Sequence, residues 1–281
     1  MSVRSLDGKK CLITGAGSGI GRATALRASE VGAELFLTDI NSVGLEETVA
    51  MVGAGGGTVR MAKALDISDY DEVVKFGTEI HTQFSSMDVV MNIAGISAWG
   101  TIENLEHRHW KSMVDVNLMG PIHVMETFVP PMIRAGKGGH LVNVSSAAGL
   151  LALPWHAAYS ASKFGLRGVS EVLRFDLKRH GIGVSLVVPG GVKTPLVGTV
   201  EIAGIDRNDP RVEKLTHRFE ARAVSPEKVA SCILRGIEKN TYLVYTSNDI
   251  RVGYWWARKF ALPYEFVMQK ANDQFSKLLK R

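Results

Sequence analysis

The chain has 281 residues, of which 46% are hydrophobic, and a formal net charge of +5. It contains no stretch of about 18 uncharged apolar residues and no apolar signal segment at its amino terminus, which argues against a membrane-spanning protein and predicts a cytoplasmic one. Its two cysteines, Cys11 and Cys232, have apolar neighbours and form no CxxC pair or Cys/His cluster, so we expect buried thiols and no metal site.

The first predicted elements are a strand, a glycine-rich turn and a helix. An apolar run at 10–13 precedes the segment Thr14-Gly-Ala-Gly-Ser-Gly-Ile-Gly21, and residues 20–31 then have helical character up to Gly32. Glycines allow a sharp turn and a close approach to a pyrophosphate, whose charge is favoured at a helix N-terminus. This context predicts a dinucleotide site that includes Gly15, Ser18, Gly19, Ile20 and Gly21.

A second apolar strand is predicted at 34–38 and is followed by Asp39. This aspartate lies 18 residues after Gly21, the spacing at which a carboxylate accepts hydrogen bonds from the adenosine ribose. Its charge would repel a 2′-phosphate, and the one basic residue nearby, Arg22, is expected to face outward. The predicted cofactor is therefore NAD rather than NADP. Asp39 also suits the N-cap of the next helix, a role compatible with ribose binding.

Further strands are predicted near residues 58–63, 87–92, 140–144, 183–188 and 242–245, and helical stretches alternate with them. This alternation predicts an α/β fold: a doubly wound, Rossmann-type parallel sheet of about seven strands with helices on both faces. No internal repeat or change of composition divides the chain. We therefore expect one domain over residues 1–281, with a basic amphipathic extension at about 250–281.

Tyr159 and Lys163 lie four residues apart on one face of a predicted helix. A free tyrosine has a pKa near ~10 and is a poor base at neutral pH. A fixed positive charge nearby favours the phenolate, so we expect Lys163, together with a cationic cofactor, to lower the pKa of Tyr159.

At this point the chain closely resembles the short-chain dehydrogenase/reductase family, in its branch with a TGxxxGxG turn and a YxxxK pair. The resemblance extends from about Leu6 to Tyr245, and further family motifs follow in order. The segment 92–95 resembles the NNAG element, with Ile93 in place of the second asparagine, a departure expected to affect strand packing more than chemistry. The segment 189–194 resembles the PGxxxT element beside the nicotinamide.

The resemblance also implies the roles of other residues. Asp66, with Ile67, would contact the adenine, and Asn117 would support a proton-relay water. The family's active serine lies 13 residues before the tyrosine, which selects Ser146 over Ser145; its hydroxyl can bond a substrate oxygen that becomes an alkoxide. The remaining implied cofactor contacts are Asn92, Ala94, Gly95, Tyr159, Lys163, Pro189, Val192 and Thr194, the last of which would hold the carboxamide.

The predicted activity is hydride transfer between NAD(H) and a hydrophobic secondary alcohol or ketone. In oxidation, Tyr159 removes the alcohol proton, Lys163 binds the nicotinamide ribose, Ser146 orients the substrate oxygen and Asn117 holds the relay water. The family also implies a homodimer or homotetramer.

The predicted substrate pocket is apolar and aromatic. The segment 150–156 after the active serine contributes Trp155 and His156, and Trp99 follows the NIAG turn. His156 is expected to be a pocket wall rather than a second base. The segment 196–222 is expected to form a mobile lid. Lys193 is the one cation that could meet a charged substrate.

Residues 251–281 carry seven basic residues and two acidic ones, which accounts for the whole net charge. Apolar residues recur there at helical spacing from Tyr264 onward. We expect the stripe Val267, Ala271, Phe275 and Leu278 to be buried against the parent domain or a neighbouring subunit. Peripheral contact with an anionic membrane is the alternative. Nucleic-acid binding is not expected, because the charge is confined to a short tail and no recognition motif occurs.

Two other functional classes are possible on this fold. A catalytically silent NAD-binding sensor or scaffold would typically lack Tyr159 or Lys163, and both are present. An isomerase or epimerase of the longer family branch would need a substrate domain, for which too few residues follow the last strand. A family enoyl reductase would have a wider spacing of tyrosine and lysine.

Overall fold

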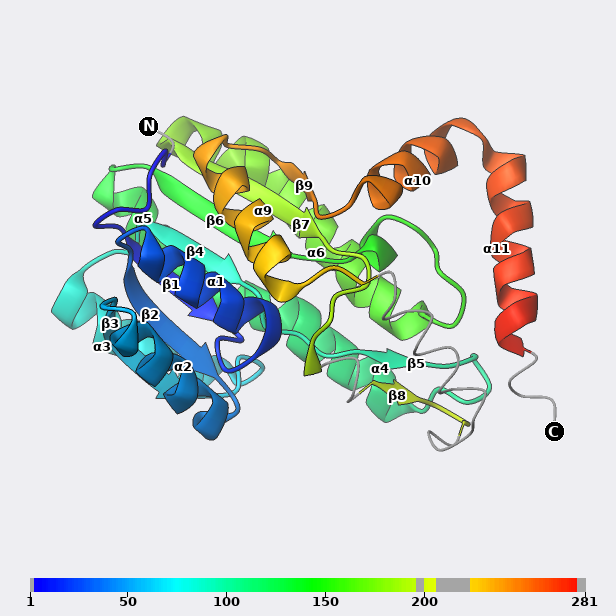
Figure 1. The fold of residues 1–281 in the computed structure, drawn as a ribbon, viewed down its shortest axis with the longest axis horizontal. Helices are drawn as coiled ribbons and strands as arrows, with labels where there is room; N and C mark the ends of the chain where they lie inside the picture. Colours follow the sequence, from blue (N-terminus) through cyan, green and yellow to red (C-terminus); the bar gives the residue numbers. More distant parts are fainter. Residues whose placement is uncertain (1–2, 196–199, 206–222, 277–281) are drawn as a thin grey trace.

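A seven-stranded parallel sheet organises the computed structural model, which describes residues 3–195, 200–205 and 223–276. The strand order is β3-β2-β1-β4-β6-β7-β9, and all six pairings are parallel (Figure 1). The seven strands that the sequence predicts are all present: β1 (Lys10–Thr14), β2 (Glu34–Asp39), β3 (Thr58–Ala64), β4 (Val89–Asn92), β6 (Gly139–Val144), β7 (Ile182–Val188) and β9 (Leu243–Tyr245).

Helices cover both faces of this sheet, because successive residues of each central strand point to opposite sides. In β1, Cys11 and Ile13 belong to one buried cluster, whereas Leu12 belongs to the other. The first cluster packs against α1 (Gly19–Glu30), α2 (Ser42–Ala54) and α9 (Pro226–Glu238), and the second against α3 (Tyr70–Phe84), α5 (Gly120–Ala135) and α6 (Ala157–Asp176). The predicted doubly wound α/β fold is therefore confirmed.

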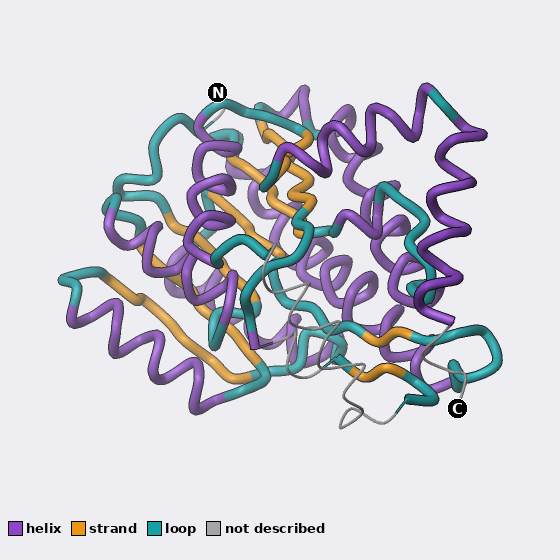
Figure 2. The backbone as a smooth tube through the Cα atoms, turned by 45° about the vertical axis from the view of Figure 1, so that its right-hand side comes forward, coloured by secondary structure: helices purple, strands orange, loops and turns teal. Residues whose placement is uncertain are grey.

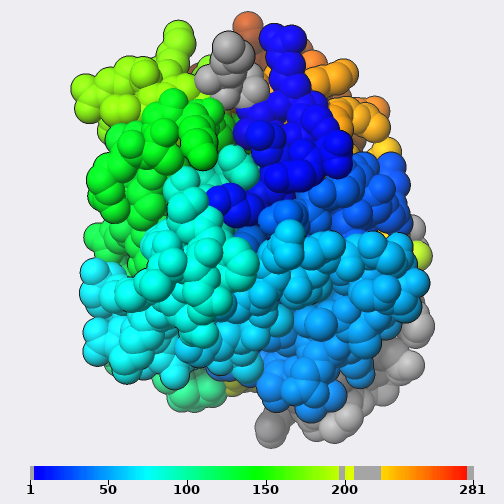
Figure 3. All heavy atoms as spheres, turned by 90° about the vertical axis from the view of Figure 1, so that its left-hand side faces the viewer, coloured from blue at the N-terminus to red at the C-terminus, as the bar shows by residue number. Residues whose placement is uncertain are grey.

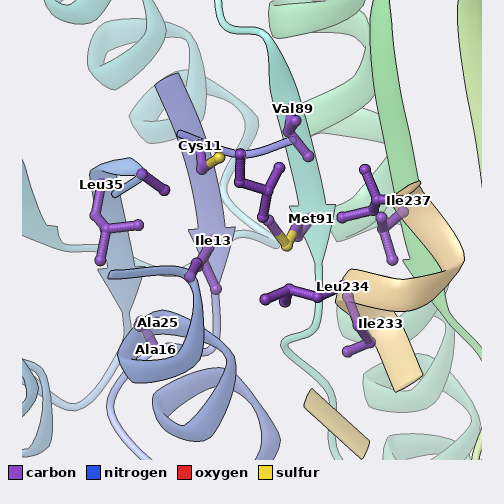
Figure 4. Packing of buried hydrophobic residues seen from close by; sticks show 14 of the residues in the cluster. Cys11, Ile13, Ala16, Ala25, Leu35, Val89, Met91, Ile233, Leu234 and Ile237 are labelled. Carbon is purple, nitrogen blue, oxygen red and sulfur yellow. The ribbon is translucent and has the colours of Figure 1, made fainter. Parts of the chain in front are cut away.

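The packing on the first face shows how the central strands are held. Ile233, Leu234 and Ile237 of α9 lie over Ile13 and Met91 (Figure 4). Burial of each such side chain contributes roughly 1.5–3 kcal/mol relative to exposure. The thiol of Cys11 lies in the same cluster, and burial raises its pKa far above the ordinary value.

The sheet also fixes where a ligand would bind. Strand β1 lies between β2 and β4, so the strand order reverses beside β1. In open α/β sheets, ligands bind outside the carboxyl ends of the strands at this reversal. The glycine-rich turn follows β1 directly, and residues 93–95 follow β4.

A second, two-stranded sheet lies beside the main one and was not predicted. It pairs β5 (Ala98–Trp99) with β8 (Glu201–Ile202). An ion-pair cluster connects β8 to α4 (His107–Val114), since Glu201 accepts from both guanidinium nitrogens of Arg108 at 2.9 and 2.5 Å. His109 Nδ1 accepts from the amide of Glu106, so its Nε2–H donates to Glu201, at 2.9 Å.

The C-terminal helices α10 (Asn248–Lys259) and α11 (Ala261–Ser276) extend away from the sheet, as the orange and red segments in Figure 1 show and Figure 2 confirms from another angle. At the opposite end, the dark blue to cyan residues of the first third of the chain form a closed surface (Figure 3). None of the described helices combines the length and apolar composition that a membrane crossing requires.

Among the described residues, the predicted burial of the α11 stripe against the parent domain is found only in part, because Ala271 and Phe275 are half-buried but Val267 is exposed. No residue of α11 is fully buried, and Val267 is 45% exposed. The half-buried face is instead formed by Tyr264, Met268, Ala271 and Phe275, one residue out of phase with the prediction at its start. Leu278 lies outside the described residues. An apolar stripe identifies a helix face but not the partner that covers it. The sequence therefore could not show that Val267 is exposed.

Candidate active site

The glycine turn between β1 and α1 has no room for larger side chains. Gly15 has φ +69°, and a Cβ there would lie 2.7 Å from Cα of Ala94; a Cβ on Gly21 would lie 1.9 Å from the carbonyl oxygen of Gly15. Helix α1 begins at Gly19, with Ser18 as its N-cap. The turn therefore brings bare backbone to a helix N-terminus, an arrangement that fits the pyrophosphate of a dinucleotide.

Asp39 lies at the carboxyl end of β2 beside this turn. Its Oδ2 accepts from the amide of Gly17 at 2.8 Å, and its Oδ1 accepts from the amide of Asn41 at 2.8 Å. The N-cap of α2 is Asn41, not Asp39. Asp39 therefore supports the glycine turn while its half-buried carboxylate stays at the edge of the site.

Arg22 does not face outward, contrary to the prediction. Its guanidinium folds back against α2, with Nε donating to Thr48 Oγ1 at 3.0 Å and Nη2 donating to the carbonyl oxygen of Gly17 at 2.6 Å. The same Nη2 lies 2.7 Å from Glu47 Oε2 and 3.0 Å from the carbonyl oxygen of Gly44. Gly44, Glu47 and Thr48 belong to α2, so no pattern within α1 could have indicated these partners.

The segment after β4 is fixed by Thr14 at the end of β1. Thr14 Oγ1 accepts from the amides of Ile93 and Ala94 at 3.0 and 3.1 Å. Asn92 is buried, and its Nδ2 donates to Asn143 Oδ1 on β6 at 2.9 Å. Ile93 lines the cavity described below as well as packing on the core, so its substitution in the NNAG element also changes the wall of the site.

Asn117 lies in a π-helical turn, Asp115–Met119, between α4 and α5. Its side chain is buried and exchanges hydrogen bonds of 2.9 Å with both the amide and the carbonyl of Ile96. A Cβ on Gly95 would lie 2.9 Å from Asn117 Oδ1 and 3.3 Å from Lys163 Nζ. Glycine at position 95 therefore allows Asn117 and Lys163 to approach each other, which the sequence did not indicate.

Ser146 and Tyr159 both line the cavity described below, and the Ser146 hydroxyl opposes the effect of burial on the pKa of the tyrosine. Ser146 follows β6 and also caps the short 3-10 turn Ala147–Gly149, accepting from the amide of Ala148 at 3.1 Å. The hydroxyl of Ser145 instead donates to the carbonyl oxygen of Lys163 at 2.9 Å. The two neighbouring serines thus differ in role: one faces the tyrosine and the other fixes α6 to β6.

Burial shifts the pKa of both Tyr159 and Lys163. Burial raises the pKa of Tyr159 above its ordinary value, and the Ser146 hydrogen bond only partly opposes this. Lys163 Nζ lies 5.8 Å from the tyrosine ring centroid and donates to the carbonyl oxygen of Val144 at 3.1 Å. Burial lowers the pKa of Lys163 to about 8. Both shifts have one cause, because a buried site disfavours the charged form of each group.

The segment after β7 closes the other side of the site. Pro189 accepts from the amide of Ala147 at 2.7 Å, and a Cβ on Gly19 would lie 3.0 Å from Thr194 Cγ2. Thr194 is therefore beside the first residue of α1. Val192 forms an isolated parallel bridge with Val224.

Asp66 and Ile67 lie on the connection from β3 to α3, away from the catalytic pair. Asp66 Oδ1 accepts from both the amide and the hydroxyl of Ser68 at 2.8 Å. Ile67 is buried, and its carbonyl oxygen lies 3.0 Å from Nδ1 of His123.

A cavity of about 210 Å³ connects these segments. Its described walls contain Ser146, Tyr159 and Lys163, the cofactor-side residues Ile20, Gly95, Pro189, Val192 and Thr194, and a largely apolar remainder that includes Ile93, Ile96, Trp99, Leu153, His156 and Val200. The ionisable groups among the described lining residues are His156, Tyr159 and Lys163. Lys193 does not line it. Ile96 and Ser97 were not predicted, since isolated loop residues give no periodic signal, whereas Leu153 and Val200 lie in the two segments expected to shape the pocket.

Besides Ser146, the predicted substrate-binding residues are Trp99, Trp155 and His156. Trp99 and His156 line this cavity. Trp99 donates from Nε1 to Ser97 Oγ at 2.8 Å, and its ring lies 4.6 Å from that of His156. Nδ1 of His156 lies 2.6 Å from the carbonyl oxygen of Pro154, and burial lowers the pKa of His156.

Trp155 instead points toward α11, where its ring lies 5.4 Å from that of Phe275. Its φ of +65° turns the side chain away from the cavity. Most of the predicted lid, 196–222, lies outside the described residues.

Comparisons with known proteins agree with this geometry. The family model described as short chain dehydrogenase matches residues 9–203. SadH of Mycobacterium tuberculosis, named as an oxidoreductase, is 36% identical over 273 residues, covering 96% of this chain and 98% of SadH. A short-chain dehydrogenase/reductase from Burkholderia phymatum, solved with NAD, superposes with a TM-score of 0.83 at 28% identity and covers 92% of this chain and 95% of its own. A metagenomic short-chain oxidoreductase solved with NADP gives 0.68 at 28% identity, covering 85% and 96%.

Proposed function

Because this chain belongs to the short-chain dehydrogenase/reductase family and is an oxidoreductase of that family, we propose that it transfers a hydride between NAD(H) and a hydrophobic secondary alcohol or its ketone. The observation that carries this proposal is the Ser146–Tyr159 pair on the wall of a cavity whose other described residues are mostly apolar.

A nicotinamide dinucleotide would supply the hydride acceptor or donor. The bare glycine turn would hold its pyrophosphate, Asp39 its adenosine ribose, Lys163 its nicotinamide ribose and Thr194 its carboxamide. Asp39 supports NAD over NADP, because a 2′-phosphate would meet its carboxylate. Arg22 does not offset that charge, because its guanidinium is already paired with Glu47. The family itself uses both cofactors, as the two ligand-bound neighbours illustrate.

In the proposed oxidation, Tyr159 accepts the proton of the substrate hydroxyl as the hydride leaves the carbinol carbon. Ser146 donates a hydrogen bond to the same oxygen and orients it. Lys163 is close enough to Tyr159 to stabilise the phenolate, although the buried environment opposes ionisation of both. Reduction is the reverse, with Tyr159 as the acid. A raised tyrosine pKa favours the protonated acid that ketone reduction requires.

The substrate class follows from the cavity wall. Its described residues include no aspartate, glutamate or arginine that would pair with a charged substrate. The rings of Trp99 and His156, tilted by 35° to each other, provide an aromatic surface next to Tyr159, whose ring centroid is 6.3 Å from that of His156. A silent NAD-binding scaffold would have no need for the buried Lys163 or for the Ser146–Tyr159 hydrogen bond.

The test is a panel of apolar secondary alcohols and ketones, with hydroxy acids as charged controls. Formation or loss of reduced nicotinamide is followed by absorbance with NAD(H) and, separately, with NADP(H). We expect turnover of apolar substrates and a higher kcat/KM with NAD. Cofactor binding without any turnover would favour the scaffold function, and turnover confined to hydroxy acids would overturn the substrate class.

A further inference from the structure

The described part of the C-terminal segment carries an exposed apolar surface on two helices. We define the tail patch as the exposed side chains Val252, Trp255, Phe260, Leu262, Phe266 and Val267. Trp255 is 56% exposed, Leu262 79% and Phe266 57%. Within the patch, the rings of Trp255 and Phe260 lie 6.1 Å apart and join α10 to the start of α11. Apolar side chains this exposed and this concentrated on a surface indicate an interaction site.

Basic residues lie on the same two helices as the tail patch. Arg251, Arg258, Lys259 and Lys270 are exposed on the same helices, where the described acidic residues are Asp249, Glu265 and Asp273. Lys270 Nζ lies 4.5 Å from the ring centroid of Phe266, so its stem covers the aromatic ring while its ammonium remains exposed. Over residues 251–281 the sequence has seven basic residues and two acidic ones, whereas residues 1–250 are neutral overall.

We propose that α10 and α11 bind the surface of an anionic lipid bilayer through the tail patch. Tryptophan and phenylalanine insert favourably at the boundary between headgroups and acyl chains. Arginine and lysine next to that boundary are attracted to anionic headgroups. The tail patch has both features together.

The other possible occupants fit less well. The parent domain contacts the opposite face of α11, where Tyr264 Oη accepts from the amide of Ala152 at 2.8 Å and Phe275 packs on Trp155. A second copy of the chain would bring an equally basic segment against this one, and like charges at an interface are unfavourable. An anionic surface is the partner that satisfies both the apolar and the basic residues.

The position of these helices connects the lipid surface to the cavity. The segment that α11 contacts, Ala152 and Trp155, also supplies Leu153 and His156 to the cavity wall. A bilayer held at the tail patch would therefore lie beside a cavity suited to apolar molecules. The binding itself is independent of the reaction, so it is measured without substrate and its failure leaves the proposed oxidoreductase activity untouched.

The experiment is co-sedimentation of the full-length protein with vesicles of phosphatidylcholine alone and of phosphatidylcholine with phosphatidylglycerol. We expect the protein to bind the anionic vesicles and to bind vesicles of phosphatidylcholine alone only weakly. High salt should reduce binding to the anionic vesicles. The triple variant R258Q/K259Q/K270Q should lower the partition coefficient on the order of 100-fold, since each basic residue at an anionic surface contributes roughly 1 kcal/mol. The variant W255S/F266S should weaken binding to a similar degree.

The matched control is Phe175→Ser on α6, because Phe175 is 65% exposed and lies beside Arg174 but is outside the tail patch. It should leave vesicle binding unchanged. Absence of binding to anionic vesicles by the folded wild type would overturn the proposal. It would also be overturned if W255S/F266S converts an oligomer to a smaller species while vesicle binding stays as in the wild type, because the tail patch would then be a contact between copies.

Discussion

Asp39 and Gly17 are joined by a hydrogen bond of 2.8 Å from the glycine amide to the aspartate carboxylate. The residue that we propose selects the cofactor therefore also holds the turn that would bind the pyrophosphate. Substitution of Asp39 acts on both functions, and the two can be separated by comparing alanine with asparagine.

We expect Asp39→Ala to lower kcat/KM for NAD by about 10–100-fold, the scale of one hydrogen bond to a charged group. Discrimination against NADP should shrink, because a repulsive charge has been removed without an attractive one being added. Asp39→Asn keeps an acceptor for the Gly17 amide, so it should retain more stability while losing the same discrimination. A wild-type preference for NADP would contradict the assigned role of Asp39.

Tyr159→Phe keeps the ring and removes the proposed acid/base group. We expect kcat to fall at least ~10²-fold with little change in the Kd for NAD. Ser146→Ala should also lower kcat, whereas Ser145→Ala serves as its control, because the Ser145 hydroxyl bonds the carbonyl of Lys163 rather than facing the tyrosine. A Tyr159→Phe enzyme with most of its activity would exclude the mechanism.

Lys163 is buried at a cost to stability. Its pKa falls from 10.5 to about 8, so at neutral pH the folded state carries an ammonium that the unfolded chain solvates better. The penalty is roughly 3 kcal/mol below pH 8 and disappears as pH rises to 10.5, because the folded protein loses that proton first. The hydrogen bond to Val144, about 1 kcal/mol, partly offsets it.

Lys163→Met should therefore raise the free energy of unfolding at pH 7 by about 2 kcal/mol while abolishing activity. Urea unfolding of both proteins at pH 7 and pH 10 checks this, with a smaller difference expected at the higher pH. A variant that is less stable than wild type at pH 7 would show that the ammonium is well solvated in the folded state.

His140 predicts a second dependence of stability on pH. It is buried on β6, its Nε2 lies 2.8 Å from Ser185 Oγ, and burial lowers its pKa from 6.5 to about 4. Between these values the unfolded chain binds a proton that the folded chain does not, so stability is complete above pH 6.5 and is lost as pH falls toward 4. The loss should approach roughly 3 kcal/mol.

The measurement is urea unfolding of wild type and His140→Gln at pH 6.5 and at pH 4. The comparison separates the contribution of His140 to stability from that of the carboxylates. The variant can keep a hydrogen bond to Ser185 and should lose less stability on acidification. His107→Gln replaces an exposed histidine and serves as the control. Over the same change of pH it should lose as much stability as the wild type does. Equal losses in His140→Gln and wild type would place the acid sensitivity elsewhere.

Glu201→Gln tests the connection between β8 and α4. Glu201 accepts from Arg108 and from His109, and these hydrogen bonds lower its pKa to about 2. The Arg108–Glu201 pair is largely exposed, although His109 is buried, so loss of these contacts should raise KM for apolar substrates only about 3–5-fold, with kcat nearly unchanged. Glu103→Gln, exposed and outside this cluster, is the control. A fall in kcat with unchanged KM would indicate that β8 acts on the reacting groups rather than on the cavity wall.

The sequence predicted the sheet, and it predicted that Tyr159 and Lys163 lie together, because the signals for both are local. Continuous apolar runs mark β1 and β4, and the helical spacing of Tyr159 and Lys163 brings both to one wall of the cavity. Features set by tertiary contact were missed: the return of Arg22 to α2, the reversal of Trp155 at a positive φ, and the partner of α11. The effect of burial, which raises the pKa of Tyr159, was also not predicted, since the depth of burial is not written in the YxxxK spacing.

Helices α10 and α11 are attached to the rest of the molecule by a few side chains, among them Tyr254 with Arg167, Tyr264 with Ala152 and Phe275 with Trp155. The sheet, by contrast, is enclosed by two extensive apolar clusters. Such a difference gives a hierarchy of local opening, in which amides of the two helices exchange with solvent hydrogen long before those of β1 or β4. We therefore expect α11 to open and close again far more often than the sheet unfolds, with α10 held more firmly through the buried Ile250.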